Sequence, residues 1–402
     1  MYYSIIMTIR MDALVGAIAV ALDIVEGELL GASTHHGKRI AALCSAMGRH
    51  LGLNEDDLGS LTSCALLHDN ALTEYILAER EGRESSMKLH CEFGQRNADT
   101  LQFKTNIDGF ILYHHERANG DGPYGKRAGE YPLGAELIAI ADFIDVSHHL
   151  QRVSLDQLPQ LRQDIAANTG VIHTPLAAEA MLAALDEAML LSLGDDRILD
   201  TADRLIPPWT MDMDSQVILN LAGFVSHIID YKSAFTRRHS AGIADKAWSM
   251  GQYYGYDHTM LSELYLAASL HDIGKLTIPT QILEKPDKLD DHEFNIIKGH
   301  VLKTYELLGD IDGFEQIRSW ASNHHEKLDG SGYPFGKGAD ELDFNSRLMA
   351  CIDIYQAVSE ARPYHPERDH KTTMEILYDM AGKGYVDEKI AKDMDKALSI
   401  RT

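Results

Sequence analysis

Residues Ala267–Lys275 read AASLHDIGK, and residues Cys64–Leu72 read CALLHDNAL. Each stretch sets a His-Asp pair directly after an apolar run, at positions 271–272 and 68–69. Only the later stretch continues into Gly-Lys. The two stretches therefore share a pair of potential metal ligands and differ in the residues that follow it.

The two His-Asp pairs belong to a longer internal repeat. His36 precedes the first pair by 32 residues, and His239 precedes the second pair by the same 32. Further along each copy, a single His is followed after 24 residues by a His-His pair, and an Asp lies on an apolar segment 27 or 28 residues later. These positions are His90, His114, His115 and Asp142 in the first copy, and His300, His324, His325 and Asp353 in the second. We conclude that one unit has been duplicated.

Apolar residues recur every three to four positions along most of the chain, and alternating strand patterns are scarce. The sequence therefore predicts an all-α protein of two tandem helical bundles. We place the first copy at residues 1–153, a helical linker region at 154–210 and the second copy at 211–402. Gly/Pro clusters predict loops near 119–133, 206–208 and 329–338.

The composition is that of a folded protein, with 45% hydrophobic residues and 11 Pro in 402 residues. The net charge of −24 argues against binding to DNA, RNA or an anionic membrane. The apolar run Ala13–Leu22 is too short to span a bilayer and lacks a signal-peptide cleavage pattern. The four Cys follow no zinc or redox spacing, so we expect reduced thiols in the core of a cytoplasmic protein.

The repeated positions are all His and Asp, a ligand set that suits Fe, Mn, Zn or Ni. Seven ligands are too many for one tetrahedral metal and suit two ions bridged by a carboxylate. A two-metal centre polarises a phosphoryl oxygen and generates hydroxide at neutral pH, so phosphoester hydrolysis is the natural chemistry. A single His is more often structural, and we discount the pair His148-His149 because it matches nothing in the repeat.

The second half resembles the HD-GYP phosphodiesterases of the wider HD superfamily. The likeness is strong over Gln216–Lys371, in the strings FTRRHS, LHDIGK, IPTQIL, KGH, NHHEKLDGSGYP, ID and ARPYH, and weak over Asp12–Leu150. It implies a helical HD-type bundle in each half. It also implies hydrolysis of a cyclic dinucleotide, chiefly cyclic di-GMP to linear pGpG, with cyclic GMP-AMP as the alternative substrate.

The resemblance also assigns roles to residues of the second copy. It makes His239, His271, Asp272 and Asp353 the ligands of one metal, with Asp272 bridging to a second metal held by His300, His324 and His325. Lys275 would hold a phosphate oxygen, and Arg362 the second phosphate. Gly330, Gly332, Tyr333 and Pro334 would shape the loop beside the metals, with Gly332 and Tyr333 at the substrate. Fe or Mn is the expected metal pair, with Ni and Zn as alternatives.

Two positions depart from the family pattern. Phe235 stands where members with a third metal carry Glu, so we expect two metals and slow or absent cleavage of the linear product. His365 stands where Lys or Arg is frequent, which leaves one phosphate contact neutral or sensitive to pH.

The first copy keeps every matching ligand position: His36, His68, Asp69, His90, His114, His115 and Asp142. Asn70, Ala71 and Leu72 replace the Ile-Gly-Lys of the second copy, and GDGPY replaces GSGYP. Whether the first copy binds metal is left undecided by the sequence, whereas the residues expected to bind phosphate are absent from it. We expect a catalytically weak domain that serves regulation, stability or dimer contacts, and we leave a homodimer open.

Three functions were weighed. A metal-dependent phosphodiesterase leads, because the second copy keeps Lys275 and all the expected ligands. A signalling protein that binds a cyclic dinucleotide without turnover is the alternative. A mononucleotidase of the HD type is disfavoured by the GYP and RPY strings.

Overall fold

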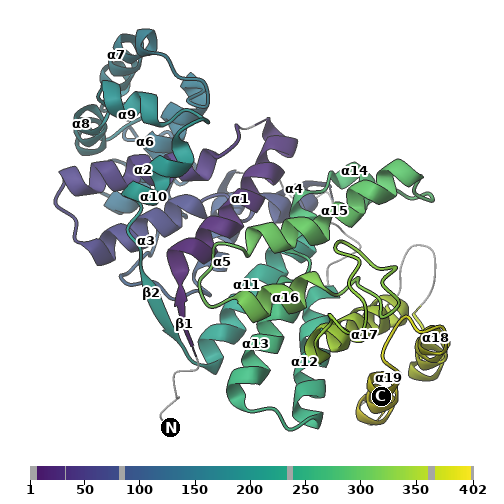
Figure 1. The fold of residues 1–402 in the computed structure, drawn as a ribbon. Helices are drawn as coiled ribbons and strands as arrows, with labels where there is room; N and C mark the ends of the chain where they lie inside the picture. The colour runs from purple at the N-terminus through teal and green to yellow at the C-terminus, as the bar shows by residue number, and fades with distance from the viewer. Residues whose placement is uncertain (1–6, 32, 81–86, 233–238, 361–366, 400–402) are drawn as a thin grey trace. The chain divides into compact units, whose positions relative to one another are not determined.

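The computed structural model of the protein describes residues 7–399 except 32, 81–86, 233–238 and 361–366 (Figure 1). The described residues are mostly helical, which confirms the predicted fold class. Strand β1 (Met7–Arg10) pairs with β2 (Thr210–Met213) in a two-stranded sheet. No helix in the described ranges is both long enough and apolar enough to cross a membrane. The chain divides into two compact units, residues 10–211 and residues 1–9 with 212–402.

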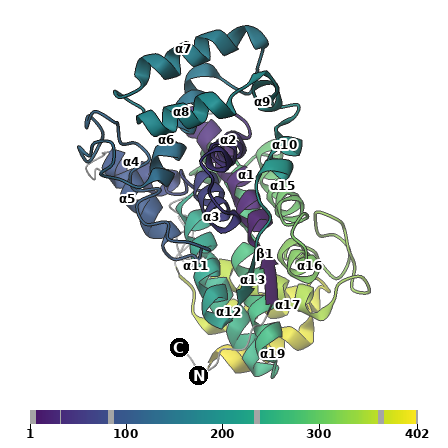
Figure 2. The same ribbon diagram turned by 90° about the vertical axis from the view of Figure 1, so that its left-hand side faces the viewer.

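The first unit is built around a central helix, α2, on which α3, α6, α8 and α10 pack (Figure 1, Figure 2). Helices α8 and α10 come from the segment that the sequence analysis set apart as a linker region, and the structure groups them with the first copy. The helices are α1 (Met11–Leu30), α2 (His36–His50), α3 (Glu55–Leu66), α4 (Leu72–Arg80), α5 (Met87–Ala98), α6 (Leu133–His148), α7 (Leu158–Asn168), α8 (Pro175–Ala184), α9 (Glu187–Ser192) and α10 (Ile198–Leu205), with the short 3₁₀ turn η1 (Leu155–Gln157).

The second unit centres on the pair α12 and α13, with α11 and α16 packed on α13 and α17 packed on α12. A 3₁₀ turn, η2, lies between α13 and α14 and packs on α15. The elements are α11 (Ser215–Tyr231), α12 (His239–Tyr253), α13 (His258–Leu270), η2 (Ile273–Thr277), α14 (Thr280–Leu283), α15 (Asp291–Leu307), α16 (Glu315–Ser322), α17 (Phe344–Ser359), α18 (His370–Gly382) and α19 (Glu388–Leu398).

Matching caps fix the helices that deliver the two His-Asp pairs. Asn54 accepts a hydrogen bond from the backbone N–H of Asp57 at the start of α3, and Asp257 accepts one from Met260 at the start of α13, both at 2.9 Å. Each helix then runs through a buried apolar stretch; α3 ends two positions before His68, and α13 ends directly before His271. The two copies therefore present their first ligands from the same structural position.

Gly274 allows η2 to approach α15 closely. A Cβ at this position would lie 2.0 Å from the carbonyl oxygen of His300, a distance that no side chain tolerates. In the first copy the close glycine is Gly94, which lies on α5, the helix that carries His90. A Cβ there would lie 2.9 Å from Ile111. The Gly of the HDIGK string is thus explained by packing beside a metal-ligand helix.

Candidate metal centres

The second unit brings six of its seven predicted ligands to one place from separate elements. His271 and Asp272 follow α13, His300 lies on α15, His324 and His325 follow α16, and Asp353 lies on α17. His271, Asp272 and His324 form one group of potential ligand atoms, and His300, His324 and His325 form another, each with all atoms within 4.8 Å. The seventh ligand, His239, begins α12, but its side chain lies outside the described part of the chain.

The carboxylate of Asp272 lies between two of the predicted His ligands. Its Oδ2 lies 3.1 Å from Nε2 of His271, and its Oδ1 lies 3.2 Å from Nε2 of His300. The two carboxylate oxygens thus face different His rings. Burial raises the pKa of this carboxyl group, but the charges of His271 and Lys275 outweigh burial and hold the pKa well below its usual range. The group is therefore an anion, which is the form that binds metal.

Backbone carbonyls orient three of the His rings. Nδ1 of His271, His300 and His324 lies 2.7, 2.6 and 2.6 Å from the carbonyl oxygen three residues earlier in each case. A carbonyl only accepts, so each Nδ1 carries a proton, and Nε2 is the ring nitrogen on the side away from that carbonyl. Burial, followed by the charge of the neighbouring His325, lowers the pKa of His324 well below its usual range and keeps that ring neutral.

Lys275 lies on η2 with its ammonium 2.5 Å from Oδ2 of Asp272. Its side chain is 19% exposed, whereas those of His271, His300 and His324 are at most 1% exposed. The ammonium therefore sits between the buried ligands and solvent. A phosphate that approached the centre from solvent would meet this cation.

The loop with the GSGYP string is held by the Glu that follows the His-His pair. Glu326 is buried, and its carboxylate accepts hydrogen bonds from the backbone N–H groups of Phe335, Gly336 and Lys337 at 2.7 to 3.2 Å. Gly332 packs so closely on this residue that a Cβ would lie 2.4 Å from the Glu326 Cα. Gly332 thus has a clear packing role, and its predicted contact with substrate stays a prediction.

Tyr333 lies beside the metal ligands. Its ring stacks on His325, with centroids 4.9 Å apart, and the ammonium of Lys298 lies 5.4 Å from its centroid. The side chain of His325 is 29% exposed, and its Nδ1 lies 3.7 Å from Oδ2 of Asp353. Tyr333 and Lys298 therefore line the solvent side of the centre, and sequence analysis assigned no role to this Lys.

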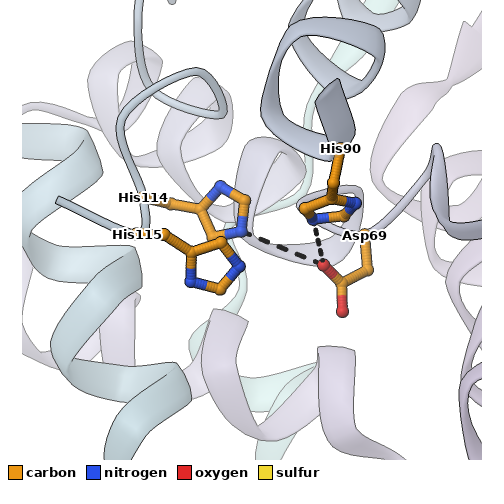
Figure 3. A group of neighbouring side chains, drawn as sticks. All are labelled: Asp69, His90, His114 and His115. Carbon is orange, nitrogen blue, oxygen red and sulfur yellow. Dashed lines mark ion pairs between the residues drawn. The ribbon is translucent and has the colours of Figure 1, made fainter. Parts of the chain in front are cut away.

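The first unit assembles all seven of its matching positions into a second centre. Figure 3 shows Asp69 facing His90 at 2.9 Å and His114 at 3.9 Å, with His115 beside them. The atoms of these four residues form one ligand group, and His36, His68 and Asp69 form another. Asp142 lies 3.4 Å from Nε2 of His36. The first copy therefore keeps the geometry of a metal site as well as its residue types.

Three residues of the first centre were missed by sequence reasoning. Glu26 on α1 lies 3.5 Å from Nε2 of His36, and Asp145 on α6 lies 2.6 Å from Nδ1 of the same ring. Arg39, which is fully buried, donates to Asp145 at 2.6 Å. Helix α1 also carries Asp12, Asp23 and Glu28, so its sequence did not single out Glu26.

Three residues to which the sequence assigns a role lie outside the described part of the chain. They are Phe235, His365 and Arg362, the expected contact to a second phosphate. Their roles stay predictions.

A family model described as HD domain matches residues 223–390, the part of the chain that holds the predicted ligands of the second unit. The expected resemblance of the second copy to the HD superfamily and its HD-GYP phosphodiesterases is confirmed over these residues. The same assignment for the first copy stays a prediction.

Curated relatives match the chain beyond the HD domain. A 3′3′-cGAMP-specific phosphodiesterase 1 of Vibrio cholerae is 27% identical over 89% of this chain and 85% of its own length. A 3′3′-cGAMP-specific phosphodiesterase 3 of the same organism is 29% identical over 74% of this chain and 65% of its own. The cyclic di-GMP phosphodiesterase response regulator RpfG of Xanthomonas campestris is 32% identical over 40% of this chain and 43% of its own. The chain thus spans less than two thirds of two of these relatives.

A solved structure shares the fold of nearly the whole chain. The crystal structure of a cyclic GMP-AMP-specific phosphodiesterase of V. cholerae matches with a TM-score of 0.67 and 22% identity, covering 98% of this chain and 99% of that one. At this identity the match shows the fold. The fold of the first unit is therefore shared as well as that of the HD domain.

Proposed function

We propose that the second unit hydrolyses a phosphodiester bond of a cyclic dinucleotide. The observation that carries the proposal is the placement of Asp272 between two groups of His ligands, with Lys275 on its solvent side. The relatives matched over both halves are named as phosphodiesterases of such nucleotides. The curated names include cyclic GMP-AMP and cyclic di-GMP.

The ligand set fits two divalent ions. His271, Asp272, His300, His324, His325 and Asp353 would hold them, together with His239. When bound, such a pair supplies a water-derived nucleophile and charge that stabilises the reacting phosphoryl group. The neutral state of His324 and the ionised state of Asp272 suit this task. Fe and Mn are the ions we propose first.

The residues of the chain have separate tasks around the phosphate. The Lys275 ammonium would bind a non-bridging oxygen and offset the charge that develops there. Tyr333 and Lys298 would border the substrate on the solvent side of His325. Because the whole chain carries a net charge of −24, these local cations are needed to attract a substrate with two phosphates.

The test is an assay of the full chain loaded anaerobically with Fe(II) or Mn(II), against cyclic di-GMP and cyclic GMP-AMP in parallel. We expect a linear dinucleotide from at least one of them, and the ratio of the two kcat/KM values gives the base preference. Tight binding of either nucleotide without product, in a sample shown to hold metal, would establish the non-catalytic alternative instead.

A further inference from the structure

Glu26 is a buried carboxylate inside the first centre that the repeat does not supply. It lies on α1, is 6% exposed, and faces Nε2 of His36 at 3.5 Å, close to Asp142 at 3.4 Å from the same atom. His36 thus presents one ring nitrogen to two carboxylates. Asp142 is one of the repeated positions, whereas Glu26 is not.

The carboxylates of this centre repel one another. Glu26 and Asp142 both face Nε2 of His36, and Asp69 faces His68, His90 and His114. Carboxylates gathered around largely buried His rings are unfavourable in a protein interior unless a cation offsets them. Divalent cations bound among them would do so.

The His rings of the centre are also held as metal ligands are. Asp145 accepts from Nδ1 of His36 at 2.6 Å and is itself anchored by Arg39, which bonds Asp195 at 3.0 Å. This support directs Nε2 of His36 toward Glu26 and Asp142.

Two further rings show the same arrangement. Nδ1 of His68 and of His114 lies 2.8 and 2.6 Å from a backbone carbonyl oxygen. Their Nε2 atoms are buried and make no hydrogen bond among the described residues. Buried ring nitrogens without a partner, aimed at a shared carboxylate, are explained by a bound cation.

The two centres differ in charge beside the bridging aspartate. In the second unit Lys275 lies 2.5 Å from Asp272, whereas Leu72 holds the matching position in the first unit. There the additional charged group is the carboxylate of Glu26. The first centre therefore favours cations more strongly than the centre of the second unit. It also lacks the ammonium that would bind a phosphate oxygen.

We propose that the first unit binds divalent metal ions at a centre of its own, with Glu26 as a ligand beside His36 and Asp142. This centre does not bind a phosphodiester. The complete ligand set is Glu26, His36, His68, Asp69, His90, His114, His115 and Asp142. The first copy is thus a metal-binding unit with an added carboxylate ligand, and its substitutions after the His-Asp pair removed phosphate binding only.

The test counts metal in the full chain. The double variant His271→Ala/Asp272→Ala removes ligands of the second unit, so the metal that stays after loading with Mn(II) and desalting belongs to the first. We expect about two ions per chain, the number that a site with a bridging carboxylate holds. Adding Glu26→Gln should lower that number by about one, while adding Glu28→Gln, an exposed position on the same helix, should leave it unchanged.

Spectroscopy separates a ligand from a structural role. With Co(II) in the same double variant, Glu26→Gln should change the visible absorption bands, and Glu26→Asp should restore metal content in part. Circular dichroism reports whether each variant folds. A double variant that folds without retaining metal, or Glu26→Gln with the metal content and Co(II) spectrum of Glu28→Gln, would overturn the proposal. These readouts do not involve hydrolysis, so they are independent of the function proposed for the second unit.

Discussion

Nζ of Lys275 lies 2.5 Å from Oδ2 of Asp272, the carboxylate that faces His rings on both of its sides. The ammonium is partly exposed, and the carboxylate is buried. A cation at this place can stabilise negative charge on a phosphoryl group without itself being a metal ligand. The position is occupied by Leu72 in the first copy, so the contact marks the chemical difference between the two halves.

Replacement of Lys275 should lower kcat and leave the metal content unchanged. Lys275→Met keeps the length of the side chain and removes its charge, and we expect kcat to fall roughly 100-fold because one charge-stabilising contact is lost. Metal content, measured by mass spectrometry, should stay at the wild-type value. Lys303→Met on α15, which removes an exposed charge paired with Glu306, is the control and should change kcat little. Equal losses of metal and rate in Lys275→Met would contradict the role assigned to this residue.

Gly274 and Gly299 give a matched pair of substitutions. A Cβ at Gly274 would collide with the backbone of His300, whereas one at Gly299 meets nothing within 4 Å. Gly274→Ala should therefore lower the free energy of unfolding by about 2 kcal/mol or more and displace a metal ligand. Gly299→Ala, within α15, should raise it by about 0.5 to 1 kcal/mol. Chemical denaturation measures both, and the reverse order would show that η2 does not pack on α15 in this way.

Glu326 should be needed for the conformation of the GSGYP loop. Its buried carboxylate accepts hydrogen bonds from three backbone N–H groups. Glu326→Gln should therefore lower the free energy of unfolding by about 1 to 3 kcal/mol and make the loop more sensitive to proteolysis. We expect kcat/KM to fall about tenfold because Tyr333 loses its position beside His325. Glu341→Gln, at an exposed residue of the same loop with one such bond, should be close to wild type. Proteolytic resistance of Glu326→Gln equal to that of Glu341→Gln would contradict this account.

Stability should fall in acid through His173. This ring is buried against Phe143, and burial lowers its pKa to about 4. The unfolded chain, where the pKa of His is about 6.5, binds the proton more readily, so the contribution is complete above pH 6.5 and is lost as the pH falls toward 4. The loss from this residue should be about 1 to 3 kcal/mol. His173→Gln should remove that part of the pH dependence in urea titrations at several pH values, and an unchanged dependence would refute the assignment.

The sequence predicted the ligand positions because the repeat fixes their order and helix ends fix their placement. Asn54 and Asp257 cap matching helices, so the His-Asp pairs necessarily emerge at equivalent points. Six of the predicted ligands of the second unit and seven of the first lie close together, as the spacing indicated, and their binding of metal stays a prediction.

Other parts of the fold depend on packing between distant segments and were not predictable in this way. Glu26 and Asp145 reach His36 from α1 and α6, and nothing in their local sequence identifies the partner. The apolar spacing over residues 177–193 continues across a break at Leu185, where Asp186 caps a new helix, α9. Contacts of the segment after residue 154 with α2 are likewise tertiary.

The most direct test of the central claim compares the metal-loaded full chain with Asp272→Ala in one assay. Each protein is incubated with cyclic di-GMP and with cyclic GMP-AMP, and the products are separated by chromatography and identified by mass. The account predicts a linear dinucleotide from the wild type and none above background from Asp272→Ala. Equal product from both proteins, or none from a wild type shown to hold metal in its second unit, would contradict it.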